Sequence, residues 1–375
     1  MLKPTYVTKL EKVQGLTQSD KEKLAPVGDR FAFRANSYYL SLIDWDDPND
    51  PIRRIIIPHP DELEDWGKLD ASNESAYTVA PGTEHKYTDT AVLLVNDVCG
   101  GYCRFCFRKR IFMADNAEVV RDVEPGLEYI RNHPEITNVL LTGGDPLVMS
   151  TRKLENIVSH LRVIDHVRIV RIGSKLPVFN PYRVIDDPSL AEMIRTFSLP
   201  RKRMYIIVHF NHPKEITDVA LKGVRMLQEA GAIVANQTPL LRGVNDSPDV
   251  LGELFKRLSF CGIPPYYVFI GRPTAGNHHF AVPVEEALTI FEQARLKVSG
   301  LAKRARLAMS HATGKIQVVG MTEEYVFFRY LRAFDHKDSG RFMVYKRNPD
   351  ACWFDDYTER VDEHSYLEEE EIEDA

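Results

Sequence analysis

Residues 91–106 read AVLLVNDVCGGYCRFC, an apolar run followed closely by three cysteines, Cys99, Cys103 and Cys106. A short apolar run bounded by polar residues is typical of a strand buried on both faces of a parallel sheet. The cysteines come directly after it, at the strand end where the active sites of α/β barrels form. This stretch therefore links the fold of the chain to its chemistry.

Similar apolar runs recur along the chain, and helix-like segments separate them. The further runs are 138–141, 167–172, 204–208, 232–235 and 266–270, with a weak seventh at 306–309. The helix-like segments are 126–132, 151–161, 189–197, 215–229, 248–260 and 284–298. Regular alternation of this kind predicts βα units that form a parallel sheet. We therefore expect an α/β fold.

Polar or glycine-rich clusters follow each of the first six runs. They lie at 99–106, 142–146, 173–175, 209–213, 236–238 and 271–273. Loops after strands are often polar, but six clusters rich in ligand-type side chains indicate one shared site at the carboxyl edge of the sheet.

Both ends of the chain differ from this repeating middle. Residues 1–85 lack clear strands, and turn signals separate their helix-like segments, so we expect an N-terminal helical extension there. The barrel is expected over 86–315, and a C-terminal element over 316–360. Residues 361–375 carry eight acids and no base, which predicts an acidic, disordered tail.

Composition excludes several classes of protein. The 375 residues are 44% hydrophobic, and no apolar run approaches the roughly 18 residues that span a membrane. The formal charge of −6 comes from the acidic tail, so bulk charge suggests no nucleic-acid partner. The first residues contain no apolar signal core, and five cysteines are an odd number, which argues against a disulfide framework. We expect a cytoplasmic protein that binds no membrane.

The chemistry of the three clustered cysteines leaves two kinds of site open. Close thiolates select zinc or an iron–sulfur cluster. A structural zinc ion requires a fourth Cys or His ligand close by, and no fourth ligand follows Cys106 at a zinc-site spacing. Three ligands on a [4Fe–4S] cluster leave one iron open to substrate. The alternative is a zinc-bound cysteine knuckle in a non-enzymatic metal- or nucleic-acid-binding module, for which the basic stretch 104–110 is the best support.

The chain resembles the radical S-adenosylmethionine (SAM) enzymes, whose CxxxCxxC motif follows the first strand of a partial barrel. It is similar in particular to the lysine 2,3-aminomutase family, over about residues 36–315. The matching stretches are CRFCFRKR at 103–110, LTGGDPL at 141–147, RIGS at 171–174, HFNHP at 209–213 and LRGVND at 241–246. The resemblance implies a partial (β/α)6 barrel with extensions at both ends. It also implies a [4Fe–4S] cluster that cleaves SAM to a 5′-deoxyadenosyl radical, and pyridoxal phosphate (PLP) holding the substrate amine.

The same resemblance assigns roles to particular residues. Arg108 matches the arginine that grips the substrate carboxylate, a bidentate task suited to guanidinium. Lys315 matches the Schiff-base lysine, whose amine burial and positive neighbours can activate. The expected cofactor-binding residues are Gly143, Gly144, Asp145, Ser174, His209, Gln237, Lys86 and Lys315. Structural alternatives are a strand-to-helix turn at Asp145, a solvated basic patch around Arg108, an exposed Lys315 and a structural His209.

Several positions depart from the family pattern. The two aspartates that recognise the lysine ε-ammonium are missing, and Arg272 stands at the first of these positions. Because a cation repels an ammonium group, Arg272 favours an acidic, glutamate-like substrate. Of two arginines that bind the PLP phosphate in the family, one is matched by Lys86 and the other is replaced by Thr90. The family's zinc-binding cysteines have no counterpart, so we expect no zinc.

We therefore expect a radical SAM isomerase, a PLP-dependent amino-acid 2,3-aminomutase with Lys315, Arg108 and Arg272 as catalytic residues. A radical SAM enzyme acting on protein-bound lysine, or without PLP, is the alternative. The expected partners are a small amino acid and an electron donor such as flavodoxin or ferredoxin. We also expect a homo-oligomer.

Overall fold

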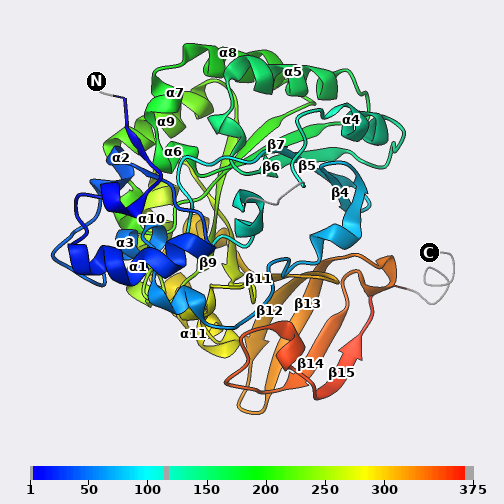
Figure 1. Cartoon of the computed structure of the whole chain (residues 1–375). Helices are drawn as coiled ribbons and strands as arrows, with labels where there is room; N and C mark the ends of the chain where they lie inside the picture. The colour runs from blue at the N-terminus through cyan, green and yellow to red at the C-terminus, as the bar shows by residue number, and fades with distance from the viewer. Residues whose placement is uncertain (1–2, 114–117, 368–375) are drawn as a thin grey trace.

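A computed structural model gives the fold of residues 3–113 and 118–367. Among these residues thirteen strands form one continuous sheet, whose seven central strands pair in parallel. These are β5 (Thr90–Asn96), β6 (Asn138–Gly143), β7 (Ile169–Ser174), β8 (Met204–Val208), β9 (Ile233–Leu240), β10 (Pro265–Ile270) and β11 (Arg306–His311). The curved sheet does not close on itself (Figure 1). The predicted partial barrel is confirmed, with the weak seventh run present as β11.

Helices connect successive parallel strands and cover the outer face of the sheet (Figure 1). They are α4 (Glu124–Arg131), α5 (Thr151–Arg162), α6 (Leu176–Phe179), α7 (Tyr182–Ile185), α8 (Pro188–Phe197), α9 (Asp218–Glu229), α10 (Pro248–Phe260) and α11 (Val284–Leu296). In α5 the side chains of Leu154, Ile157, Val158 and Leu161 are buried, the spacing of a helix with one apolar face. None of the helices within the described ranges combines the length and apolar character needed to cross a membrane.

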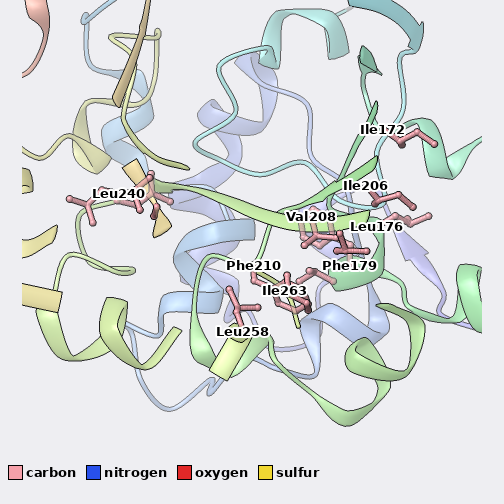
Figure 2. Packing of buried hydrophobic residues seen from close by; sticks show 14 of the residues in the cluster. Ile172, Leu176, Phe179, Ile206, Val208, Phe210, Leu240, Leu258 and Ile263 are labelled. Atoms are coloured by element: carbon pink, nitrogen blue, oxygen red, sulfur yellow. The ribbon is translucent and has the colours of Figure 1, made fainter. Parts of the chain in front are cut away.

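The core fills the space between the strands and these helices. Figure 2 shows Ile206 and Val208 of β8 beside Leu176 and Phe179 of the short helix α6. Val208 and Ile206 have no exposed surface, and Phe179 is 1% exposed. Full burial of such a side chain stabilises a fold by about 1.5–3 kcal/mol. The core therefore fixes the position of each strand end at which the functional loops begin.

Antiparallel strands extend the sheet at both edges. On one side are β3 (Thr78–Ala80) and β4 (Thr83–Tyr87), so the expectation that 1–85 lacks strands is wrong. On the other side are β12 (Gly314–Met321), β13 (Tyr325–Ala333), β14 (Phe342–Lys346) and β15 (Arg360–His364). The expectation of a disordered tail is wrong for residues 361–364, which lie in β15, where pairing with β14 satisfies their backbone. Residues 368–375 of the expected tail lie outside the described residues.

The N-terminal segment packs against the cysteine loop. It contains the strands β1 (Tyr6–Val7) and β2 (Ala35–Asn36) and the helices α1 (Gln18–Arg30), α2 (Ser37–Leu40) and α3 (Pro51–Ile56). Asn36 is fully buried, and its Nδ2 donates to the carbonyls of Gly100 (3.1 Å) and Phe179 (2.8 Å). Arg34 Nε donates to the carbonyl of Cys99 at 2.9 Å. The extension therefore holds the loop that carries the cysteines.

A buried ion pair ties together the loops that follow β7 and β8. Lys175 Nζ lies 2.5 Å from Glu215 Oε1, which also accepts a 2.5 Å hydrogen bond from the Tyr39 hydroxyl. The side chain of Glu215 has no exposed surface, and that of Lys175 is 7% exposed. Removing one partner from such a pair leaves an uncompensated buried charge.

We expect Glu215→Gln to lower the free energy of unfolding by about 3 kcal/mol, because Lys175 would lose its counter-charge. The exposed Glu229, replaced in the same way, should change stability by less than about 0.5 kcal/mol. Urea titration of both variants measures the difference, and equal stabilities would contradict the role assigned to the pair.

Candidate active site

A cavity of about 400 Å³ opens inside the curved sheet at the carboxyl ends of the parallel strands. Every residue that the sequence placed in the site lines this cavity. They are Lys86, Cys99, Cys103, Cys106, Arg108, Gly143, Gly144, Asp145, Ser174, His209, Gln237, Arg272 and Lys315. The sheet, with its antiparallel edge strands, therefore brings together residues separated by more than 200 positions in the chain.

The three cysteines lie in the loop after β5, and all three thiols are free. Burial raises the pKa of Cys99, and the neighbouring Asp145, Cys106 and Cys103 raise it further. In the part of the chain that the structure describes, no three His, Cys, Asp or Glu side chains converge on a single metal ion. A four-iron cluster would bond each thiolate to a different iron.

Gly143 and Gly144 allow the loop after β6 to pack on the backbone just before the cysteines. Gly143 has φ +106°, and a Cβ there would lie 2.6 Å from the carbonyl oxygen of Asn96. A Cβ on Gly144 would lie 2.7 Å from the backbone nitrogen and oxygen of Val98. Glycine is required because any side chain would collide. We expected the backbone at Gly143 and Gly144 to approach a ligand closely. In the structure this backbone lies close to the backbone of residues 96–98 instead.

Asp145 holds two of the functional loops together. Its carboxylate accepts hydrogen bonds from Ser174 Oγ (2.7 Å), from the backbone nitrogens of Lys175 and Leu176 (both 2.8 Å), and from that of Leu147 (3.0 Å). Burial raises its pKa to about 6, although these hydrogen bonds favour the ionised form. Asp145 and Ser174 therefore position the loops after β6 and β7 in this structure. This agrees with the alternative in which Asp145 belongs to a strand-to-helix turn.

The edge of the Arg108 guanidinium that could bind a carboxylate through two hydrogen bonds is occupied by Glu74. Arg108 Nε and Nη2 donate to the two carboxylate oxygens of Glu74 at 3.0 and 2.6 Å. The remaining Nη1 lies 3.3 Å from Thr142 Oγ1, where a substrate carboxylate could still bind. The basic stretch is not a solvated patch, because Arg110 Nη2 also donates to Glu74 at 2.7 Å. Arg108 lowers the pKa of Glu74 to about 2 against the opposing effect of burial.

Glu74 and Glu84 are site residues that sequence reasoning missed. Both line the cavity, and Glu84 Oε2 lies 3.5 Å from Arg108 Nη2. Burial raises the pKa of Glu84 to about 7, although Arg108 favours its ionised form. No sequence signal marks either residue, since they lie in a region expected to be a helical extension. Glu74 and Glu84 therefore place carboxyl groups beside the positive charge of Arg108 at its end of the cavity.

Arg272 follows β10 and stacks on an aromatic ring, and Glu74 and Glu84 act on its charge without contacting it. Its guanidinium carbon lies 3.6 Å from the ring centroid of Phe107, a favourable cation–π distance. Within the described residues, its Nη1 is shielded from solvent and has no hydrogen-bond partner. No carboxylate among them lies within 4 Å of its side-chain nitrogens. Burial lowers the pKa of Arg272 to about 10.

Lys315 lies in β12 and not in a loop, since β11 and β12 form a tight antiparallel hairpin. Its Nζ lies 4.2 Å from the ring centroid of Tyr267. Burial lowers the pKa of Lys315 to about 7, and the cationic side chains of Arg171, Arg332, Arg272 and Lys86 add to this effect. The amine is therefore available as a nucleophile near neutral pH.

Two further cofactor candidates contact each other on neighbouring strands. Gln237 lies within β9, and not after it as expected, with its Nε2 3.0 Å from Nε2 of His209. Because an amide nitrogen can only donate, His209 accepts this hydrogen bond with an unprotonated nitrogen. Burial lowers the pKa of His209 to about 3, with a contribution from Lys175. His209 is therefore a neutral residue of the cavity wall.

Comparison with known proteins agrees with this geometry. Residues 93–254 match the family model of the radical SAM superfamily. The chain is 58% identical over 360 residues, 96% of either chain, to the "Putative L-lysine 2,3-aminomutase" of Aquifex aeolicus. It is 38% identical to L-lysine 2,3-aminomutase of Clostridium subterminale, covering 78% of this chain and 70% of that protein.

A relative with a different substrate is also similar. The chain is 36% identical to glutamate 2,3-aminomutase of Clostridioides difficile, covering 80% of this chain and 70% of that enzyme. The superfamily implies a [4Fe–4S] cluster and SAM, and the cysteine triplet lines the cavity. Identity at these levels over most of both sequences means that the chain belongs to the 2,3-aminomutase family of radical SAM isomerases.

Proposed function

We propose that the chain is a PLP-dependent 2,3-aminomutase that moves the amino group of an acidic, glutamate-like amino acid from the α to the β carbon. The observation that carries the choice of substrate is Arg272, a cation of the cavity wall whose buried Nη1 has no hydrogen-bond partner among the described residues. The family includes both lysine and glutamate aminomutases, so substrate must be argued from the site.

The cavity holds residues for each cofactor that such a reaction needs. Bound cluster and SAM supply a carbon radical, and bound PLP supplies a carbonyl that holds the migrating amine. Cys99, Cys103 and Cys106 would hold the cluster. The loops fixed by Asp145 and Ser174 lie beside them and would hold SAM through their backbone. Lys315 would carry PLP, because its amine loses its charge near neutral pH.

The charges of the cavity favour an anionic side chain. Glu74 is committed to Arg108 and Arg110, and Glu84 lies beside Arg108. Arg108 Nη1 would bind the α-carboxylate, while Arg272 Nη1 would bind the side-chain carboxylate. A lysine ε-ammonium at Arg272 would meet a like charge in a site shielded from water, which is strongly unfavourable.

The substrate proposal is tested by turnover of an amino-acid panel after anaerobic reconstitution with iron, sulfide and PLP. We expect activity on glutamate or a similar acid, and Arg272→Gln should raise its KM by about 10- to 100-fold, the effect of losing one charged hydrogen bond. Arg304→Gln, at an exposed arginine, is the matched control and should leave KM unchanged. Strong activity on lysine alone would refute the acidic substrate.

The role of Lys315 predicts a specific pH dependence. Its neutral, nucleophilic form dominates above a pKa of about 7, so the rate of PLP loading should rise with pH up to about 7 and then level off. An ordinary lysine would keep accelerating toward its pKa of about 10.4.

The loading rate can be followed by the absorption of lysine-bound PLP in cofactor-free protein. Lys315→Ala should abolish the absorption band. Persistence of the band in this variant would instead favour a PLP site elsewhere, and its absence in the unaltered protein would favour a PLP-free reaction.

A further inference from the structure

Five cationic side chains line the same region of the cavity. They are Lys86, Arg171, Arg272, Lys315 and Arg332. The charges of the other four act on the amine of Lys315, and Arg332 is the partner of Lys315 in the pairing of β12 with β13. Arg332 comes from β13, in a C-terminal region that sequence reasoning left without any site residue. A register shift between Lys315 and Ile316 interrupts the alternation of Val326, Phe328 and Tyr330, and it pairs Arg332 with Lys315.

Few carboxylates contact this cluster, although Glu74 and Glu84 act on Lys86 and Arg272 from beyond 4 Å. Among the described residues, Asp89, beside Arg332, is the one carboxylate within 4 Å of any of the five. Lys86 Nζ donates to the backbone carbonyl of His311 at 2.5 Å, and Arg171 Nε to the amide oxygen of Asn138 at 2.9 Å. Cations held together away from water are costly unless an anion joins them. The cavity is therefore built to receive a strong anion.

The position of Arg332 fits an anion attached to Lys315. In the antiparallel pair of β12 and β13, Arg332 lies directly opposite Lys315, so the two side chains share one face. The guanidinium Nη1 donates to Thr90 Oγ1 at 3.1 Å, and Nη2 donates to Asp89. Its carbon lies 4.3 Å from the ring centroid of Tyr87, which fixes its plane. A guanidinium oriented in this way can present a donor pair to a phosphate.

The ion pair of Arg332 contributes too little to the stability of the fold to explain why an arginine stands at this position. Its ion pair with Asp89 lies near the surface, where the side chains are 32% and 57% exposed. Exposed pairs of this kind contribute little to stability. Asp89 and Thr90 are better explained as residues that hold the guanidinium in place when the anion is absent.

We propose that the C-terminal strand β13 completes the cofactor site, with Arg332 and Lys86 binding the phosphate group of PLP. This inference rests on the proposed function. Thr90 stands where the family has a second phosphate-binding arginine, and its side chain carries no charge. In this proposal Arg332, whose guanidinium contacts Thr90, supplies the missing positive charge. A substrate carboxylate is the other anion that could bind Arg332, so the experiment must separate cofactor from substrate.

The test is titration of the full-length, cofactor-free protein with PLP and with pyridoxal, which lacks the phosphate. Binding is followed by the absorption of the cofactor, independently of turnover. We expect Arg332→Gln to weaken PLP binding about 10- to 100-fold, the effect of losing one charged hydrogen bond, and to leave pyridoxal binding unchanged. Inorganic phosphate should compete with PLP in the unaltered protein and much less in the variant.

Three variants control for a merely structural effect. Arg329→Gln removes an exposed arginine of the same strand and should leave PLP affinity unchanged. Arg332→Lys keeps the charge and should retain part of the affinity. Asp89→Asn breaks the surface ion pair but frees the guanidinium, so PLP affinity should be unchanged or higher.

The possible outcomes separate this inference from the proposed function. Unaltered PLP affinity in Arg332→Gln, equal loss for PLP and pyridoxal, or a similar loss in Asp89→Asn would overturn the phosphate role. A raised KM for the amino acid with unchanged PLP affinity would assign Arg332 to the substrate and also overturn it. If the unaltered protein binds no PLP at all, both the inference and the PLP-dependent function fail.

Discussion

Backbone hydrogen bonds between parallel strands are the constraint on which the rest of this structure depends. They align β5 to β11 so that all seven carboxyl ends reach the same edge of the curved sheet. The loops that leave this edge are then tied to each other by buried polar contacts, as Asp145 ties the loops after β6 and β7. Lys175 and Glu215 do the same for the loops after β7 and β8. The cavity is therefore shaped by contacts between loops whose origins the sheet has fixed.

The charges inside the cavity are separated into two regions. At one end, the carboxylates of Glu74 and Glu84 balance Arg108, so that arginine can meet a ligand only through its remaining nitrogen. Around Lys315, burial and the surrounding cations lower the pKa of its amine to about 7, and Arg272 Nη1 has no hydrogen-bond partner among the described residues. Carboxylates contact the cations of the first region, whereas among the described residues Asp89 at Arg332 is the one carboxylate in contact with the second. Both the proposed acidic substrate and the proposed phosphate site follow from this difference.

Much of the architecture could be predicted because its signals are local. Buried strands and amphipathic helices appear as short patterns in the chain, and all six predicted helical segments contain a helix. The errors lie at the edges of the sheet. The segments β3, β4 and β12 to β15 have few local signals and form strands because the sheet offers them unpaired backbone. The site was predicted by the family motifs, and its thirteen residues do line one cavity.

The sequence alone determined the α/β class, the cysteine triplet and the residues at the strand ends, because each depends on neighbours within a few positions. Only the tertiary structure decided what those residues contact. Glu74 occupies the bidentate edge of Arg108, Asp145 caps two loops, and Arg332 stands opposite Lys315. These contacts join residues far apart in the chain, and strand register, which depends on packing of the whole sheet, determines which of them meet.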